Sequence, residues 1–283
     1  MSASARSERL SAWRPPTGTV GIVALGQAGV ALRTADDLVL IDLFCSPREE
    51  RLVDSVVDPR SLRAVTAVLA THEHLDHLDL PAWPLVAEAS PAARFVVPEP
   101  LVPIVVAAGI PADRVEGVRV GQPVRLGSAI VTAVPARHAV DVADGYTLGD
   151  TTTPRWVGYV VELGGVRLYH AGDTRAHPRI IEAVAPLRPD VAYLPINGRD
   201  AERERRNIVG NLTPDEAARV ARDLSVALAI PIHFDVVRGN TGRPEAFVRA
   251  MRRRHPEASV WVPGVGGGIV WPGGGAAWDR TTA

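Results

Sequence analysis

The chain has 283 residues, a formal net charge of −1 and 46% hydrophobic residues, which is the composition of an ordinary globular protein with a large buried core. It excludes a disordered chain, which would lack that core, and it disfavours a nucleic-acid binder, which would carry a basic field. All 31 formal positive charges are arginines, so the absence of lysine excludes a Schiff-base lysine and a phosphate-loop lysine.

The chain begins with a segment that carries no secretion or membrane signal. Residues 1–12 mix Ser, Ala, Arg and Glu without an apolar core, and the apolar stretch 20–32 is interrupted by Gly26, Gln27 and Gly29. We therefore expect a cytoplasmic protein with no membrane span, in which residues 1–17 form an N-terminal extension whose flexibility the sequence leaves open. A homo-oligomer is compatible with this composition.

Short β-branched runs bounded by Gly, Pro and Asp predict a strand-rich chain. These runs cover residues 19–24, 38–43, 67–70, 94–97, 129–134, 157–163, 166–170, 191–194 and 227–232. Helical periodicity covers residues 100–108, 177–185, 213–224 and 244–254. The clearest helix start is Thr213-Pro214, an N-cap residue followed by a proline in the first turn. Gly164-Gly165 predicts a hairpin between two strands.

The order of these segments predicts an α+β layered sandwich. Strands followed by helices occupy the first half and recur in the second half, whereas a doubly wound parallel sheet would alternate strictly. No linker or low-complexity segment divides the chain, so residues 18–272 are expected to form a single domain. The Gly-rich residues 273–283 are expected to be a fraying tail.

Metal-binding side chains follow the predicted strand 67–70. His72, His74, Asp76 and His77 all lie within six residues, and loops at strand ends are where scaffolds present ligands. Because alternate side chains of an extended segment share a face, His72 and His74 are expected at one metal ion, and Asp76 and His77 at a second. A merely exposed His-rich loop is the alternative. Three histidines and an aspartate directly after a buried-looking strand favour metal binding.

Three further candidate ligands also come just past predicted strands. These are His138, Asp173 and His233. Each alone is more often a capping or core residue, but together with the His-rich loop they complete two sites, with Asp173 as the expected bridge. Cys45 is the only cysteine, so a metal would bind nitrogen and oxygen donors, which suit zinc, iron, manganese or nickel.

The complete pattern is His72-x-His74-x-Asp76-His77, then His138, Gly172-Asp173-Thr174 and His233. It resembles the metallo-β-lactamase superfamily over residues 18–271. The resemblance implies a four-layer αβ/βα sandwich, with two divalent metal ions, expected to be zinc or manganese, at one edge between the sheets.

Within that superfamily, residues 25–30, 169–174 and 231–235 are most similar to the L-ascorbate-6-phosphate lactonase-like branch. The lactonase type lacks a histidine at the position of His138, and the complete ligand set resembles the broader dimetal hydrolases. The resemblance implies a metal-dependent hydrolase in which a metal-bound hydroxide opens a small polar lactone or related cyclic ester or amide, neutral, anionic or phosphorylated. Asp76 would orient the nucleophile and accept its proton.

The connection after the predicted strand 191–194 offers candidate substrate-binding residues. They are Asn197, Arg199, Asn207 and Asn211. Arginine suits bidentate recognition of a carboxylate or phosphate, while a loop held by side-chain to backbone hydrogen bonds would explain the same residues equally well.

Two alternative functions stay open. The first is a phosphodiesterase that acts on small cyclic phosphodiesters, because a dimetal clamp also suits phosphoryl transfer. A nuclease is disfavoured, since no basic field follows a nucleic-acid backbone. The second is a non-enzymatic metal-binding module. The complete ligand set disfavours a pseudoenzyme, and redox chemistry would need a flavin domain for which the chain has no room.

Overall fold

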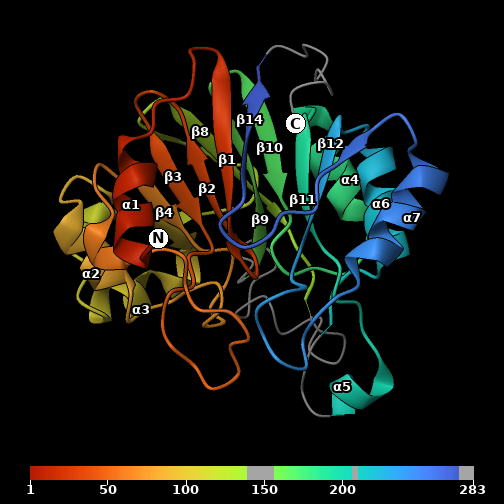
Figure 1. The fold of residues 1–283 in the computed structure, drawn as a ribbon, viewed down its shortest axis with the longest axis horizontal. Helices are drawn as coiled ribbons and strands as arrows, with labels where there is room; N and C mark the ends of the chain where they lie inside the picture. Colours follow the sequence, from red (N-terminus) through yellow and green to blue (C-terminus); the bar gives the residue numbers. More distant parts are fainter. Residues whose placement is uncertain (139–155, 206–209, 274–283) are drawn as a thin grey trace.

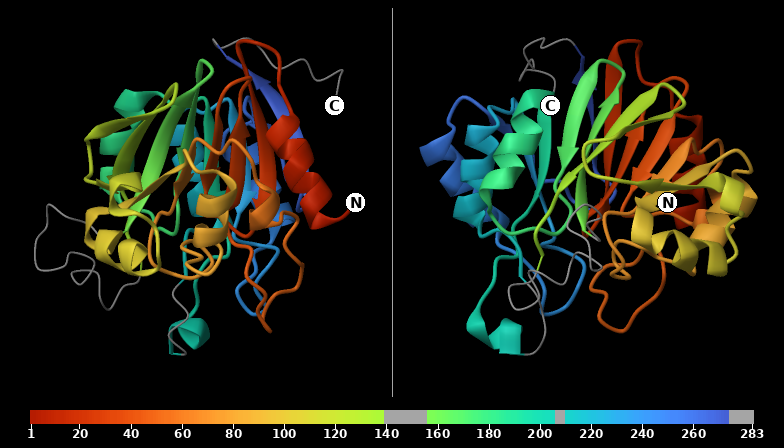
Figure 2. Two further views of the ribbon diagram at one scale, coloured as in Figure 1. Left: turned by 90° about the vertical axis from the view of Figure 1, so that its left-hand side faces the viewer. Right: turned by 180° about the vertical axis from the view of Figure 1, so that it is seen from behind.

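The computed structural model describes residues 1–138, 156–205 and 210–273, which form two β-sheets packed face to face with helices on both outer faces (Figures 1 and 2). This architecture confirms the predicted α+β, four-layer αβ/βα sandwich. In the described part of the chain, no helix combines the length and the apolar character that a membrane crossing requires. The tail beyond residue 273 and the predicted substrate residue Asn207 lie outside the described residues.

The first sheet has seven strands in the order β14-β1-β2-β3-β4-β5-β6. Pairing is antiparallel from β14 to β3 and parallel from β3 to β6. The strands are β1 (Thr19–Gly26), β2 (Gly29–Arg33), β3 (Leu38–Ile41), β4 (Ala67–Leu69), β5 (Arg94–Pro98), β6 (Val115–Val118) and β14 (Gly268–Pro272).

The second sheet repeats this arrangement with seven strands in the order β13-β12-β11-β10-β9-β8-β7. Pairing is antiparallel from β7 to β10 and parallel from β10 to β13. The strands are β7 (Pro123–Leu126), β8 (Ala129–Pro135), β9 (Val157–Leu163), β10 (Val166–His170), β11 (Val191–Pro195), β12 (Leu228–Ile232) and β13 (Ser259–Val260). The repeated order of elements in the sequence therefore corresponds to two sheets of matching layout.

Helices form the two outer layers. The first sheet is covered by α1 (Ala3–Ala12), α2 (Trp83–Ala89) and α3 (Val102–Ala107), and the second by α4 (Pro178–Val184), α6 (Pro214–Asp223) and α7 (Pro244–Arg254). The short helix α5 (Ala201–Arg205) lies apart from both layers, on a connection that extends from the body of the molecule (Figure 1).

Both faces of the central strands are buried, and β3 shows how the sequence produces this. Val39 and Ile41 pack between the two sheets, whereas Leu38 and Leu40 pack against the outer helices. Because successive side chains of a strand point to opposite faces, a strand buried on both faces is a continuous apolar run. Full burial of each such side chain contributes roughly 2 kcal/mol.

All nine predicted strands and all four predicted helices are confirmed, with ends that shift by up to two residues. At the predicted hairpin, Leu163 pairs with Val166. Gly164 and Gly165 between them have φ values of +57° and +80°, as a type I′ turn requires. The capping residue Thr213 accepts a hydrogen bond from the backbone N–H of Glu216, whose side chain completes a capping box.

The sequence analysis missed five strands, and their composition explains why. β2 contains Gly29 and Ala31 and is completely buried, so its place in the sheet is decided by its neighbours and not by intrinsic strand propensity. β6, β7, β13 and β14 expose several of their residues and lie at or next to sheet edges, where apolar periodicity is weakest.

The predicted N-terminal extension contains helix α1, which is attached to the first sheet. Ser2 caps this helix by accepting a hydrogen bond from the N–H of Ala5. Leu10 is buried among the residues of the outer core. The buried Arg33 donates hydrogen bonds to the carbonyl oxygens of Ser11 and Trp13, at 3.0 and 2.8 Å, and thereby satisfies carbonyl groups at the end of the helix.

Candidate metal centre

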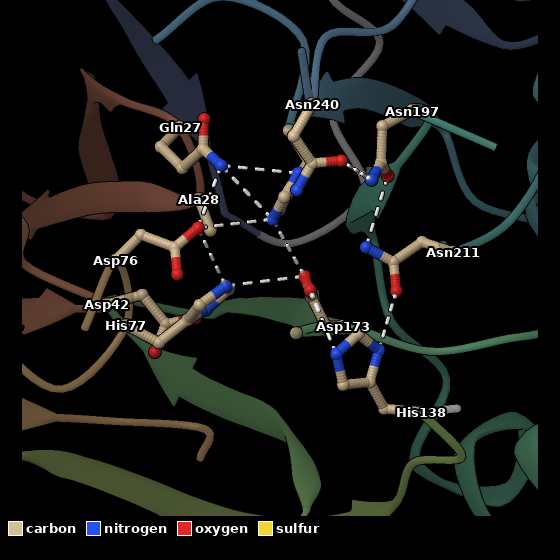
Figure 3. A network of polar contacts seen from close by, with 12 residues as sticks. Gln27, Ala28, Asp42, Asp76, His77, His138, Asp173, Asn197, Asn211 and Asn240 are labelled. Atoms are coloured by element: carbon tan, nitrogen blue, oxygen red, sulfur yellow. Dashed lines mark hydrogen bonds and ion pairs between the residues drawn. The ribbon is translucent and has the colours of Figure 1, made fainter. Parts of the chain in front are cut away.

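The predicted ligands lie together at one edge of the sandwich because the strands that precede them end there. The His-rich loop follows β4, and His138, Asp173 and His233 follow β8, β10 and β12. Neighbouring parallel strands place their carboxyl ends at the same edge of a sheet, and the two sheets present these ends to one another (Figure 3). The structure therefore brings together side chains that are up to 161 positions apart in the chain.

The donor atoms of these residues fall into two groups that could each hold a metal ion. His72, His74 and His138 form the first group. Asp76, His77 and His233 form the second. Within each group the donor atoms lie within 4.8 Å of one another. The expected pairs His72/His74 and Asp76/His77 each fall within one of these groups, and His72, His77 and Asp173 form a third group that overlaps both sites.

Asp173 lies between the two groups. Its Oδ1 is 3.4 Å from Nε2 of His77 and 3.3 Å from Nε2 of His233, whereas its Oδ2 is 3.6 Å from Nε2 of His138. The two oxygens of one carboxylate therefore face different groups of donors. This is the geometry that a bridging ligand requires.

Unpartnered buried atoms provide an independent test of whether a metal ion fits. Nε2 of His72, Nε2 of His77 and Oδ1 of Asp173 are buried and have no hydrogen-bond partner within the described residues. A buried polar atom without a partner costs about 1–3 kcal/mol, and native proteins contain few of them. Divalent cations that bind imidazole and carboxylate groups would satisfy all three atoms.

The charges of the cluster compensate one another in the absence of a metal. Burial opposes protonation of His233, but the nearby carboxylates of Asp173 and Asp76 raise its pKa to about 9. Burial likewise opposes protonation of His77, yet Asp173, Asp42 and Asp76 raise its pKa well above the usual range. Both histidines are therefore imidazolium cations at neutral pH, and each has to lose one proton when a metal ion binds.

Metal binding is consequently expected to release about two protons per chain at pH 7. The release should decrease as the pH rises through 9, because His233 is then already neutral. A pH indicator in weakly buffered solution, read while zinc is added to metal-free protein, measures this release. Zinc binding that releases no protons at pH 7 would show that these histidines are neutral before the metal arrives.

Asp42, which the sequence analysis did not identify, orients His77. Its Oδ2 is 2.7 Å from Nδ1 of His77. The backbone N–H and the hydroxyl of Thr71 donate to the two oxygens of the same carboxylate at 2.8 and 2.9 Å. Asp42 is completely buried directly after β3. A carboxylate that holds Nδ1 of a histidine leaves Nε2 directed at the metal position and makes the imidazole a stronger ligand.

Two of the predicted substrate-binding residues instead lie behind His138. Nδ1 of His138 donates to Oδ1 of Asn211 at 3.1 Å, Nδ2 of Asn211 donates to Oδ1 of Asn197 at 3.1 Å, and Nδ2 of Asn197 donates to Oδ1 of Asn240 at 2.8 Å (Figure 3). Asn197 and Asn211 are both buried. The structure therefore places these two residues in a chain of amides that starts at a metal-site histidine.

Arg199, the third predicted substrate residue, forms a bidentate ion pair with Glu216. Its Nη1 and Nη2 lie 2.6 Å from Oε2 and Oε1 of Glu216, and Nη1 also donates to the carbonyl oxygen of Asn211 at 3.0 Å. The hydrogen bonds from Arg199 lower the pKa of Glu216 to about 2, against the opposing effect of burial. In the structure, Arg199 thus connects the start of α6 to the loop that carries Asn211.

Replacing Glu216 by glutamine is expected to lower the free energy of unfolding by about 1–3 kcal/mol at pH 7. Glutamine retains the capping hydrogen bond but loses the charge that pairs with Arg199. Because the pKa of Glu216 is depressed in the folded state, its stabilising effect is complete above the unfolded pKa near 4.5 and is lost as the pH falls towards 2. Urea unfolding at pH 7 and pH 3 measures both effects, and an equal difference at the two pH values would contradict this explanation.

Two further residues that the sequence analysis did not assign to the site contact it directly. Nε2 of Gln27, in the turn between β1 and β2, donates to Oδ2 of Asp76 at 2.8 Å. The ring of the buried Trp156 packs against His72, His74 and His138, with centroid distances of 4.1, 4.7 and 4.5 Å. Trp156 therefore covers all three histidines of the first group.

Comparisons with known proteins agree with this architecture. The profile of the β-lactamase superfamily domain matches residues 38–234. A metal-dependent hydrolase of Rubrobacter xylanophilus is 29% identical over 255 residues, which cover 87% of this chain and 94% of the relative. A probable L-ascorbate-6-phosphate lactonase of Salmonella gallinarum is 28% identical over 236 residues, which cover 78% of this chain and 65% of the relative. The solved structure of a metallo hydrolase from Ignicoccus hospitalis is similar in fold, with a TM-score of 0.68 and 19% identity, and the match covers 89% of this chain and 98% of that one.

Proposed function

The chain belongs to the β-lactamase superfamily of metal-dependent hydrolases, and from that membership we propose that it opens a small polar lactone or a related cyclic ester or amide. The similarity to a probable L-ascorbate-6-phosphate lactonase supports the lactone. The single observation that carries the proposal is the position of Asp173, with one carboxylate oxygen facing each group of donors.

In this proposal two divalent ions, zinc or manganese, bind at the strand ends. His72, His74 and His138 hold one ion, Asp76, His77 and His233 hold the other, and Asp173 bridges them. The unpartnered atoms of His72, His77 and Asp173 support this assignment, as does the absence of an alternative donor such as a cysteine pair.

When bound, such ions polarise the oxygen of the scissile bond and lower the pKa of a coordinated water to about 7. The protein itself has to orient the attacking water and accept its proton. Burial opposes ionisation of Asp76, but His77 and His233, whose Nε2 lies 3.4 Å from its Oδ2, outweigh it and hold the pKa of Asp76 below its usual value. Asp76 is therefore an anion at neutral pH that can accept a hydrogen bond from the water, and Gln27 fixes its Oδ2.

The test compares three substrate classes with metal-loaded protein: a neutral lactone, a phosphorylated lactone and a small cyclic phosphodiester. Lactone hydrolysis should require the metal, and kcat/KM should fall about 100-fold or more in His74→Ala. His74 is exposed, so the variant is expected to fold. His177→Ala is the matched control, since His177 belongs to neither donor group.

The outcomes separate the candidate functions. Metal-dependent cleavage of the phosphodiester without turnover of either lactone would replace the proposal with the phosphodiesterase. Loaded protein that cleaves none of the three classes would contradict the proposed reaction and favour a non-enzymatic metal-binding module.

A further inference from the structure

A small cavity beside Asp76 is lined by two arginines and an amide side chain to which the proposed reaction assigns no role. It has a volume of about 200 Å³ and is lined by Phe44, Arg48, Glu50, Arg51, Asp76 and Asn240, together with apolar side chains. Asp76 connects it directly to the second group of metal donors. A substrate whose reacting bond lies at the metal centre would therefore extend into this cavity.

The walls of the cavity are held in place by two loops that pair with each other. The N–H of Leu52 donates to the carbonyl oxygen of Val236 at 2.7 Å, and the N–H of Arg238 donates to that of Glu50 at 2.8 Å. Arg51 and Val237 form an antiparallel bridge between the loops. The first loop follows β3 and the second follows β12, so both are anchored to strands that end at the metal centre.

The guanidinium group of Arg51 is held by a stacking contact and by hydrogen bonds from Nε and Nη1. The group lies 4.1 Å above the ring centroid of Phe44. Its Nε donates to the carbonyl oxygen of Val53 at 3.1 Å and its Nη1 to that of Phe44 at 3.2 Å. No hydrogen bond of Nη2 is found within the described residues. Burial lowers the pKa of this guanidinium, which means that the cation is incompletely hydrated and would gain from an anionic partner.

The amide chain behind His138 determines which group Asn240 presents to the cavity. Oδ1 of Asn211 can only accept, so Nδ1 of His138 carries the hydrogen between them, and Nε2 of this neutral imidazole would be free to bind a metal ion. Each amide then accepts through its oxygen and donates through its nitrogen to the next amide. The oxygen of the last amide, that of Asn240, is occupied, and its Nδ2 has no hydrogen bond within the part of the chain that the structure describes. The direction of the chain thus leaves a donor on Asn240.

We propose that this cavity binds an oxyanion of the substrate, a phosphate or carboxylate group remote from the bond that is cleaved, through Nδ2 of Asn240, Nη2 of Arg51 and the side chain of Arg48. The proposal rests on the proposed function for the position of the reacting bond. Of the two carboxylates that line the cavity, Asp76 is engaged by Gln27 and His233, and Glu50 lies 4.0 Å from Arg48. Asp54, Asp79 and Asp235 also act on the charge of Arg51, but they do not line the cavity. Guanidinium and amide N–H groups are the donors that recognise such oxyanions.

The first test measures KM and kcat of metal-loaded enzyme for phosphogluconolactone, glucarolactone and gluconolactone, which carry a phosphate, a carboxylate and neither group. Asn240→Asp keeps the size of the side chain but replaces the donor with a negative charge. It is expected to raise KM for the charged lactones about 10-fold or more, with kcat and the neutral lactone little changed. Arg48→Gln, at an exposed position, should raise KM in the same direction. Arg238→Gln, on the same loop but outside the cavity, is the control.

The three substrates also identify the anion. A KM effect confined to phosphogluconolactone assigns the cavity to a phosphate, and one confined to glucarolactone assigns it to a carboxylate. Equal KM values of parent, Asn240→Asp and Arg48→Gln for both charged lactones would overturn the proposal.

A binding experiment separates this proposal from the proposed reaction. Calorimetric titration of metal-loaded protein with phosphogluconate and glucarate requires no turnover. If no lactone is hydrolysed but the affinity for either acid falls about 10-fold in Asn240→Asp and not in Arg238→Gln, the cavity is supported and the hydrolase is not. If both acids bind parent and variants with the same affinity, they bind the metals alone and the cavity is not their site.

Discussion

Replacing Asp173 by asparagine is expected to reduce metal-dependent hydrolysis on the order of 1,000-fold, because several kcal/mol of stabilisation by the metal pair would be lost. Asparagine has nearly the same shape, so the substitution removes the negative charge with little change in packing. Among the residues that the structure describes, Asp173 is the one whose two oxygens face both donor groups. An amide offers one weakly basic oxygen and therefore cannot bridge two cations.

Kinetics and metal content together test this expectation. The variant should retain at most about one equivalent of metal where the parent binds two. Asp113→Asn is the control, since Asp113 is an exposed aspartate in a short turn of helix on the outer layer. A fully active Asp173→Asn enzyme would show that the carboxylate bridges no metals.

Replacing Asp42 by asparagine is expected to weaken metal binding 10- to 100-fold, although Asp42 belongs to neither donor group, because a carboxylate that holds the far nitrogen of a metal-binding histidine contributes that much to affinity. The carboxylate holds Nδ1 of His77 at 2.7 Å and is itself held by Thr71. With asparagine, the imidazole loses the anion that makes Nε2 a strong donor. Competition with a chelator of known affinity measures the change.

Asp37 provides a matched control for Asp42. It precedes β3, whereas Asp42 follows it, so the two carboxylates lie at opposite edges of the sheet. Asp37 is also buried, and it accepts hydrogen bonds from the hydroxyl of Thr66 at 2.8 Å and the N–H of Ser128 at 3.1 Å. Both variants are expected to lose stability, but only Asp42→Asn should lose metal affinity. Equal affinity in both variants would show that Asp42 has only a structural role.

The fold was largely predictable because its central strands are apolar on both faces. Runs such as Leu38–Ile41 and Leu228–Ile232 are buried completely, and such runs are visible in a sequence without any knowledge of the tertiary structure. The missed strands β6 and β7 carry polar residues at the open edge of their sheets. Helix α1 escaped prediction because its buried residues are Ser7, Leu10 and Ser11, of which one is apolar, so the segment shows little apolar periodicity.

The clustering of the predicted metal ligands could be anticipated for a different reason. They follow strands immediately, so the prediction of a strand end also places the ligand. Asp42 satisfies the same rule directly after β3. Trp156 lies directly before β9, which starts at this edge because it is antiparallel to β8 and β10. They were missed because neither a lone aspartate nor a lone tryptophan carries a signal of its own. Their importance depends on contacts with His77 and His72, which only the folded chain creates.

The partners of the predicted substrate-binding residues could not be predicted from the sequence. Asn197 and Asn211 were identified by their amide groups, but in the structure these amides bond to each other and to His138. Arg199 is engaged by Glu216, a residue of the following helix. A polar side chain in a loop can serve a substrate or the loop itself, and the choice depends on partners that lie elsewhere in the chain.

The most direct test of the two-metal centre is the metal content of purified protein, measured by inductively coupled plasma mass spectrometry after reconstitution with zinc or manganese. About two equivalents per chain are predicted for the parent and for Asp113→Asn, with clear loss in Asp173→Asn and His74→Ala. A parent protein that binds no metal under these conditions would contradict the proposed centre and the reaction that depends on it.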